Sequence, residues 1–370
     1  MAIKDLSIIK FSNGNEDTLK FADRFRDYYF HYMSKMEKKE LGDFDNSVSL
    51  SEKEDKINKS FLGEVQRFAG CTLPEDIQPT HLVANPMIRW AAFAVVDMLI
   101  QAVLPETIIR SIGLYTEVRN VAWGDSAQFE IKPRALMTVS TGAHGQRTTV
   151  RQKQFSANKT LIPVNHNITV YASLYKVLAG KENLAEFVRT AIRSMETAFS
   201  LDAYNALNAG LTAATYPTAL VKTGYTQDTL LGLCQTVTAY NQGDKAVIVG
   251  TALALSKIIP NAANGYRIVT DSNSQSIQLI KNFFDYDILV LPQVATGDYS
   301  KYSLALDDTK IYVVSPSTDK LVKMVLEGAQ LSNGNDFYDN ANLTSNTTIN
   351  KSWACEFLSN STAGLVKLNG

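Results

Sequence analysis

The sequence predicts an α+β fold, in which two long helices are combined with separate β-rich segments and a small alternating subdomain. Apolar residues recur at helical spacing over 86–103 and 181–208. Residues 225–292 alternate between helical and strand patterns, whereas β-prone runs lie before and after them, at 108–171 and 310–368. A chain of 370 residues has room for one large domain or for two to three subdomains.

Charge and cysteine content exclude some classes of protein. The chain has 36 Lys and Arg against 37 Asp and Glu, which argues against a dedicated nucleic-acid binder. Its three cysteines lack the paired spacing of a zinc site or redox dithiol, and this indicates reduced thiols in a cytoplasmic compartment: Cys71, Cys234 and Cys355. We therefore expect any contact with nucleic acid to be non-specific.

Targeting and membrane signals are not expected either. The start MAIKDLSIIKFSNG reaches polar residues almost at once, unlike a secretory signal. The most apolar stretch, 90–104, is interrupted by Asp97 and Gln101 and is shorter than the roughly 20 residues that span a bilayer. The sequence predicts a protein with no membrane partner.

The first sixty residues predict one helix and an extended arm. Residues 16–39 carry aromatic side chains at three- and four-residue steps, which form one helical face: Phe21, Phe25, Tyr28, Tyr29 and Tyr32. This face could belong to a satellite of the core or could bind a partner, and both interpretations stay open. Residues 41–59 are charged and short of large apolar side chains, so we expect them to need a neighbouring surface.

The next part predicts a buried helix followed by a long hairpin. Asn85 caps a strongly apolar helix with Pro86 at its favoured first position. The β-prone run continues to about Tyr171, and its middle, 140–149, has two glycines and almost no apolar residue, which is typical of an exposed hairpin tip. Because isolated two-stranded ribbons are marginal in water, we expect this hairpin to rest on another subunit.

Basic residues are concentrated along the predicted hairpin, at Lys132, Arg134, Arg147, Arg151, Lys153 and Lys159. They could form a solvated ribbon or a cationic arm that docks on an acidic neighbour, where complementary charge fixes register more than it adds affinity. The candidate inter-subunit contacts combine the aromatic face with the hairpin, and they are Phe21, Phe25, Tyr28, Tyr29, Gly142, His144, Arg147, Arg151 and Lys153.

The second half predicts a long helix, then the alternating subdomain, then closing strands. The helix covers 181–208, with Gly210 as its expected end. The subdomain is expected to have helices at 227–241, 251–258 and 274–284 and strands at 246–249, 267–269 and 287–291. The closing strands are expected at 310–315, 320–326, 348–358 and 365–368.

Residues that could carry chemistry are scattered. His31, His81, His144 and His166 lie on different predicted elements without a metal-ligand spacing, so we interpret them as surface or capped polar residues. The acidic pairs Asp43–Asp45 and Asp307–Asp308 sit beside turn formers and are interpreted as turns. No phosphate-binding loop or hydrolase elbow occurs. We predict no catalytic residue, no cofactor and no metal site.

The order of these parts resembles the Hong Kong 97 type capsid fold of tailed-phage and herpesvirus shells. Along nearly the whole chain, polar arm, apolar helix, long hairpin, long helix, small α/β subdomain and returning strands follow one another as in that family. The resemblance implies an N-terminal arm at 1–60, the start of a peripheral domain at 61–116, an extended loop at 117–171, a peripheral domain with its spine helix at 172–224, an axial domain at 225–300, and the end of the axial domain with closing peripheral strands at 301–370.

The resemblance also implies a function and partners. It implies the major capsid protein of a tailed bacteriophage, a structural subunit that self-assembles into hexamers and pentamers around double-stranded DNA. The partners would be other copies of the chain, a separate scaffolding protein, the portal, and decoration or minor capsid proteins, with non-specific contact to packaged DNA. Its location would be the virion capsid, and the host cytoplasm during assembly.

Two other interpretations stay open. An encapsulin-like nanocompartment shell would have the same fold, but the long charged arm argues against it. A soluble α/β enzyme or binding module would instead have its site in the alternating half, and a pocket lined by convergent polar groups would favour it.

Overall fold

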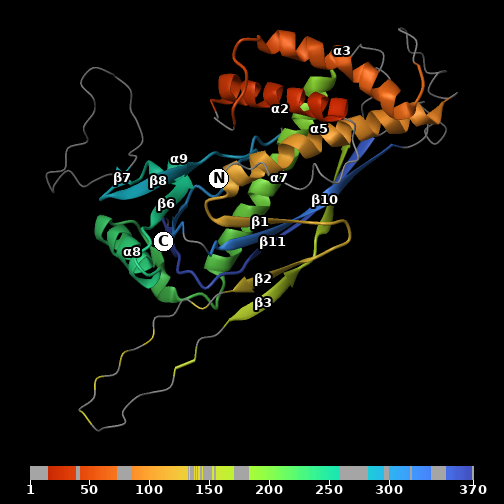
Figure 1. Cartoon of the computed structure of the whole chain (residues 1–370). Helices are drawn as coiled ribbons and strands as arrows, with labels where there is room; N and C mark the ends of the chain where they lie inside the picture. Colours follow the sequence, from red (N-terminus) through yellow and green to blue (C-terminus); the bar gives the residue numbers. More distant parts are fainter. Residues whose placement is uncertain are drawn as a thin grey trace, which may run out of the picture.

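The computed structural model describes residues 16–38, 42–72, 85–131, 156–170, 183–258, 282–295, 300–316, 319–334 and 347–368, together with positions 133, 137, 139, 141, 144, 152 and 153. Helices cover one face of a four-stranded sheet, and a two-stranded hairpin lies against the other face (Figure 1). A second, six-stranded sheet with its own helices lies beside this assembly.

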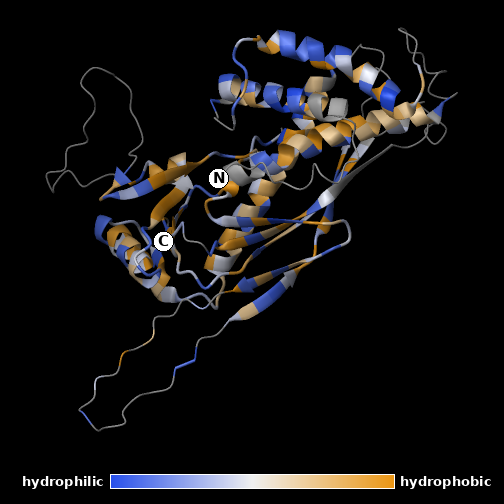
Figure 2. Cartoon of the chain, viewed as in Figure 1, coloured by the Kyte–Doolittle hydropathy of each residue, from blue (hydrophilic) through white to orange (hydrophobic). Residues whose placement is uncertain are grey.

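Four helices form the helical layer: α2 (Glu16–Glu37), α3 (Leu50–Ala69), α5 (Pro86–Ile112) and α7 (Leu184–Thr212). Their buried apolar side chains belong to one core that also includes the sheet beneath them. Hydrophobic residues are concentrated on α5 and in the strands below it, whereas the outward surfaces of α2 and α3 are hydrophilic (Figure 2). This pattern is that of amphipathic helices packed around a central apolar one.

The four-stranded sheet has the order β1–β10–β11–β4, formed by β1 (Thr116–Val121), β10 (Val322–Gly334), β11 (Thr347–Phe357) and β4 (Val164–Val170). β1 is parallel to β10, and the other two pairs are antiparallel. Because side chains alternate along a strand, Met324 and Trp353 point toward α5 and α7, on what we call the helix face. Lys323 and Val325 point to the opposite, hairpin face.

The six-stranded sheet has the order β5–β12–β9–β6–β8–β7. Its strands are β5 (Val221–Thr223), β12 (Gly364–Lys367), β9 (Lys310–Val314), β6 (Val247–Thr251), β8 (Tyr286–Leu291) and β7 (Asn282–Phe283). A 3-10 turn, Thr218–Leu220, precedes β5, and two helices, α8 (Gln227–Tyr240) and α9 (Ala252–Leu255), accompany the sheet. A second core joins α8 and α9 to these strands.

The four helices expected at 16–39, 86–103, 181–208 and 227–241 are confirmed, but α5 and α7 extend beyond their expected ends. The segments expected at 16–39 and 227–241 are α2 and α8, and that expected at 181–208 is α7. Gly210 does not end α7, which continues to Thr212. A Cβ atom at Gly210 would lie 2.1 Å from the Phe357 ring, so this glycine allows the close approach of α7 to β11.

The expectation of a charged arm at 41–59 is wrong, because most of this segment is helical. Ser49 caps the first turn of α3 by accepting a hydrogen bond from the Glu52 amide. Ile57, Phe61 and Val65 recur at four-residue steps and are buried against the helical layer. The apolar stripe of α3 is narrow and extends past residue 59, which is why the charged half alone suggested an arm.

The extended antiparallel pair expected from 108 to 171 is shorter than predicted. Residues 108–112 continue α5. Strands β1 and β4 belong to the four-stranded sheet, and the hairpin begins with β2 (Ala127–Ile131) paired to β3 (Ala157–Leu161).

The segment Trp90–Thr107 of α5 is long and apolar enough to cross a membrane by length and composition, which the sequence reading did not expect. However, 61% of it is buried in the protein, as in a core helix.

Strand predictions in the second half are confirmed at 246–249, 287–291, 310–315, 320–326, 348–358 and 365–368. The strands at 310–315 and 365–368 lie in the six-stranded sheet, whereas β10 and β11 close the four-stranded one. The helix expected at 251–258 is reduced to α9. Residues 267–269 and 274–281 lie outside the described residues, and 282–283 form strand β7 where a helix was expected.

Candidate functional site

The aromatic face of α2 is internal. Four candidate contact residues are almost inaccessible to solvent within the chain: Phe21, Phe25, Tyr28 and Tyr29. The Tyr28 hydroxyl accepts a hydrogen bond from Arg189 of α7 at 3.0 Å, and burial raises its pKa to about 12. The interpretation of this face as a partner-binding surface is therefore wrong. Its partners are α3, α5 and α7 of the same chain.

The candidate contacts on the hairpin are only partly described. Gly142, Arg147 and Arg151 lie outside the described residues. His144 and Lys153 are described, and both are exposed. Their role in contacts between subunits stays a prediction.

The root of the hairpin packs on the hairpin face of the four-stranded sheet. Ala127, Phe129 and Leu161 from β2 and β3 are buried against Val325 of β10. These side chains alternate with exposed ones along β2, as expected for a ribbon with one covered face. The hairpin is thus attached to the body by a small apolar cluster of its own.

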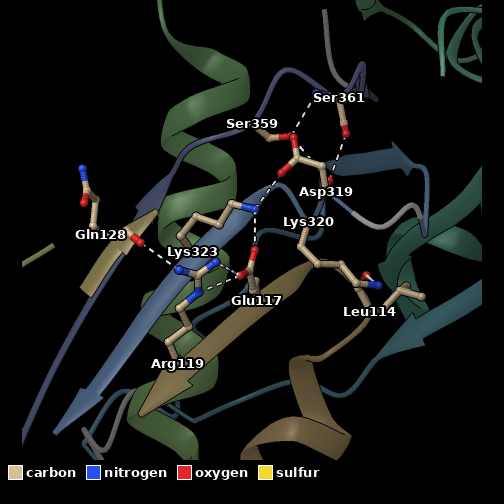
Figure 3. A network of polar contacts seen from close by, with 9 residues as sticks. All are labelled: Leu114, Glu117, Arg119, Gln128, Asp319, Lys320, Lys323, Ser359 and Ser361. Atoms are coloured by element: carbon tan, nitrogen blue, oxygen red, sulfur yellow. Dashed lines mark hydrogen bonds and ion pairs between the residues drawn. The ribbon is translucent and has the colours of Figure 1, made fainter. Parts of the chain in front are cut away.

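A buried ion network lies beside this cluster (Figure 3). The Lys323 side chain is 1% exposed, and its Nζ atom donates to Glu117 Oε2 and to Asp319 Oδ1, each at 2.7 Å. Asp319 also accepts hydrogen bonds from Ser359 and Ser361, at 2.8 Å to its carboxylate and 2.9 Å to its carbonyl oxygen. One lysine therefore links β1, the start of β10 and the segment that leads into β12.

Arg119 extends the network to the hairpin. Its guanidinium donates to Glu117 Oε1 at 2.9 Å and to the Gln128 carbonyl oxygen at 2.7 Å, and it lies 4.5 Å from the centre of the Phe129 ring. Burial raises the pKa of Glu117, but hydrogen bonds and charge from Lys323 and Arg119 outweigh burial and hold that pKa below its usual value. Glu117 is therefore ionised at neutral pH, and the network fixes the direction of β2 relative to the sheet.

An exposed ion pair joins β3, the second strand of the hairpin, to the four-stranded sheet. Lys159 of β3 pairs with Glu356 of β11, so at least one predicted basic residue of the hairpin has an acidic partner in its own chain. Both side chains are more than one third exposed. The other basic positions at 132, 134, 147 and 151 lie outside the described residues.

A tight turn joins β1 to the hairpin. The Asp125 amide donates to the Ala122 carbonyl oxygen at 3.1 Å, and Gly124 has a φ angle of +74°, which favours glycine. The Gly124 amide also donates to Glu327 Oε1 at 2.6 Å, and Glu327 itself is buried. The side chain of Trp123 is exposed to solvent, whereas the backbone of the turn is held by the carboxylate of Glu327.

The helix face carries one lysine among apolar residues. Lys351 of β11 is 6% exposed and lies opposite the irregularity in β10, with its Nζ atom 3.5 Å from the Gly328 carbonyl oxygen. Burial lowers the pKa of Lys351 to about 8, although the charges of Glu327 and Asp97 oppose this shift. Burial at this position therefore disfavours the charged form of Lys351.

Other polar residues singled out from the sequence have structural surroundings. His31 is buried and stacked on Phe44, so the interpretation of that histidine as a surface or capped residue is wrong. Asp307 accepts hydrogen bonds from Thr309, and these together with Lys310 hold its pKa at about 2 despite burial. Across the part of the chain that the structure describes, no three His, Cys, Asp or Glu residues form a group suited to a metal ion.

The sequence interpretation missed Lys323, Glu117, Arg119 and Trp123. A lysine between Val322 and Met324 in an apolar strand is a detectable signal, since a charge there must be paired if both faces of the strand are covered. Trp123 directly precedes Gly124–Asp125 between two strands, which is a recognisable turn pattern. Nothing local identifies Glu117 or Arg119, because their partners lie about two hundred residues away or across a turn.

A comparison with protein-family models identifies the family of the chain. A family model described as "SPbeta prophage-derived putative capsid protein YonB" matches residues 52–367, which is more than half of the chain. No curated protein matches. Among solved structures, the capsid of a native GTA particle is 13% identical with a TM-score of 0.50, and the match covers 71% of this chain and 91% of that one. That likeness shows a shared fold.

Two further solved structures match with lower TM-scores. A phage-related protein from Bordetella bronchiseptica RB50 is 12% identical with a TM-score of 0.48, over 74% of this chain and 96% of that one. The procapsid of satellite phage P4, which includes a size determination protein, gives 12% identity and a TM-score of 0.45 over 72% and 90%.

Proposed function

The chain belongs to the YonB capsid protein family, and from this membership we propose that it assembles into the hexamers and pentamers of an icosahedral capsid around double-stranded phage DNA. It is a structural capsid subunit with an α+β capsid fold of the Hong Kong 97 type. Its role is structural and non-enzymatic. Its location is the virion capsid, and we place the free subunit in the host cytoplasm during assembly.

The observation that carries the proposal is the anchored hairpin root. The ribbon is held in one direction by hydrogen bonds and ion pairs of Lys323, Glu117 and Arg119, in addition to its apolar packing. Fixing a ribbon before it meets a partner reduces the conformational entropy lost on association. Such a ribbon is suited to contacts that repeat with the same geometry at every subunit.

The two sheets divide the roles that the fold predicts. We assign the four-stranded sheet with α5 and α7 to the peripheral domain, α7 being the spine helix, and the six-stranded sheet with α8 and α9 to the axial domain. The extended loop would then be β2, β3 and the residues between them. The arm expected at 1–60 does not include α2 and α3, because both helices pack on the peripheral domain.

The partners follow from assembly. Other copies of the chain make most contacts, and a separate scaffolding protein, a portal, and decoration or minor capsid proteins complete the particle. Contact with DNA would be electrostatic and non-specific, in agreement with 36 basic and 37 acidic residues.

The proposal is tested by expressing the full chain and imaging the product by negative-stain electron microscopy. We expect closed shells, tubes or hexameric rings. Replacing residues 142–147 by a Gly-Ser segment of equal length should leave the thermal unfolding temperature unchanged while reducing particle yield. A wild-type chain that remains a monomer at high concentration, both alone and with the other structural proteins of its phage, would contradict the proposal.

A further inference from the structure

His31 is buried in the helical layer without a hydrogen-bond partner for either nitrogen of its ring. The residue lies on α2 and has no surface exposed to solvent. Among the residues that the structure describes, none forms a hydrogen bond with Nδ1 or Nε2. Buried polar atoms without partners are rare and destabilise the folded state. A neutral imidazole here leaves one donor and one acceptor unsatisfied, so apolar packing alone does not explain why a histidine occupies this position.

The described part of the chain between α2 and α3, residues 42–49, lies over this histidine, and we call it the connection. The Phe44 ring stacks on the His31 ring, with ring centres 4.9 Å apart and 14° between the two planes. At Gly42 the connection approaches α2 so closely that a Cβ atom there would lie 2.7 Å from the Phe30 ring. Moving the connection away from α2 would therefore expose the His31 ring to water.

Polar contacts fasten the connection to both helices. Asp27 of α2 accepts a hydrogen bond from the Asp45 amide at 2.7 Å and pairs with the side chain of Lys53 on α3. The Lys53 Nζ atom also donates to the Asp45 carbonyl oxygen at 2.6 Å and lies 6.0 Å from the centre of the Phe44 ring. Lys53 is itself buried. The aromatic ring that stacks on His31 therefore already has a buried cation beside it.

A proton on His31 is unfavourable in these surroundings. Burial lowers the pKa of His31 below its usual value, and two cations lower it further, Lys53 of α3 and Lys35 of α2. Asp27 of α2 and Asp45 of the connection oppose this shift without cancelling it. The protonated ring would also carry two N–H donors where the closed structure offers no acceptor. The closed connection thus favours the neutral ring.

We propose that His31 makes the connection an acid-sensitive latch between α2 and α3, which is closed while the ring is neutral and opens when the ring takes up a proton. Opening gives both ring nitrogens water as a partner and moves the new charge away from Lys53. The rest of α3 stays in place, because its apolar side chains are buried in the helical layer: Ile57, Phe61 and Val65. The latch lies within one subunit, so the inference is independent of the proposed function.

The sign of the pH effect follows from the form that binds the proton. In the open form the pKa of His31 is the usual value of about 6.5, and in the closed form its pKa is lower. As pH falls below about 6.5, the open form therefore binds more protons and becomes more populated. Between pH 7.5 and 5.5 the ratio of open to closed form should rise by up to about tenfold, the limit for one proton bound only by the open form.

The experiment measures amide hydrogen exchange of the full chain at pH 7.5 and 5.5 by mass spectrometry, with rates corrected for the intrinsic pH dependence of exchange. Three amides that the closed latch holds in hydrogen bonds report on residues 42–53, and they are those of Asp45, Glu52 and Lys53. Their protection in the wild type should fall by up to about tenfold at the lower pH. Helix α7 should keep its protection. Unchanged protection of residues 42–53 would overturn the inference.

Variants assign the pH effect to His31. His31→Phe keeps an aromatic ring against Phe44 and cannot be protonated, so its protection at 42–53 should no longer depend on pH. His31→Gln is a smaller non-titrating variant, which serves if the Phe ring disturbs the packing. His144→Gln removes an exposed histidine and should retain the pH dependence of the wild type. A fall in protection equal to that of the wild type in either His31 variant would overturn the inference and leave the proposed function intact.

Discussion

The two faces of the four-stranded sheet are built from different interactions. On the helix face, Met324, Leu326 and Trp353 are buried under α5 and α7 with few charges among them. On the hairpin face, a smaller apolar cluster is flanked by the network of Lys323 and Glu117. Apolar burial is non-directional, whereas hydrogen bonds to charged groups prescribe distance and angle. The helix face thus supplies stability, and the hairpin face supplies orientation.

The largest expected effect comes from the helix face. Trp353 contacts Phe199 with ring centres 4.2 Å apart and donates from Nε1 to Asp202 at 2.8 Å. Trp353→Ala would leave a large cavity and should lower the free energy of unfolding by about 3–5 kcal/mol. Urea denaturation measures this loss. A loss under about 1 kcal/mol would show that the helix face is not the main source of stability.

On the hairpin face, the matching change is Lys323→Met. It removes the cation that Asp319 and Glu117 share, although Glu117 keeps its pair with Arg119. We expect a cost of about 3 kcal/mol, near the low end for a buried pair because Glu117 is partly exposed and keeps one partner. The triple variant with Asp319→Asn and Glu117→Gln should regain most of this loss. Failure of the triple variant to recover would mean that the network contributes stability itself, and the contrast between the faces would weaken.

The pH dependence of the free energy of unfolding tests the cost of burying Lys351 on the helix face. Its pKa is lowered from 10.5 to about 8 in the folded chain, so between these values the unfolded state binds more protons. The free energy of unfolding should therefore rise by about 3 kcal/mol as pH increases from about 8 to 10.5. Denaturation at several pH values measures the slope. Lys351→Met should remove that slope, and an unchanged slope in this variant would assign it to other groups.

The smallest effect is expected from the ion pair of Lys159 and Glu356. Both side chains are substantially exposed, so Lys159→Ala should change the free energy of unfolding by less than about 1 kcal/mol. Hydrogen exchange of the β2 and β3 amides should nevertheless rise in this variant if the pair helps to hold the ribbon. A large change in global stability would show that the hairpin is part of the main folding unit.

Much of the fold was predictable because its elements bury periodic apolar faces. The helices α2, α7 and α8 and the strands β6, β8, β9 and β11 each carry their own pattern, and the order of parts led to the correct fold family. α3 was missed because charged residues dominate its first two turns. The allocation of β1 and β4 to a sheet with β10 and β11 depends on pairing across two hundred residues, for which no local signal exists.

The candidate site was less predictable. The aromatic residues of α2 form a coherent face, but the sequence cannot distinguish a neighbouring subunit from α3 and α7 as its partner, because both supply apolar surface. Phe25 and Tyr29 are buried by the same chain. The hairpin was recognised from its turn residues, whereas the network at its root joins Glu117 to Lys323 and requires the fold to be known.

The position of β12 in the six-stranded sheet determines when, during synthesis, that sheet can be completed. This strand, Gly364–Lys367, lies between β5 and β9 in the six-stranded sheet, parallel to the first and antiparallel to the second. Among the described residues β12 is the one strand that pairs with β5, so β5 cannot join the sheet until residue 367 has left the ribosome. We expect a nascent chain stalled before Gly364 to keep β5 open to proteolysis. Subunits whose synthesis has not passed β12 would then lack a complete six-stranded sheet and would not assemble.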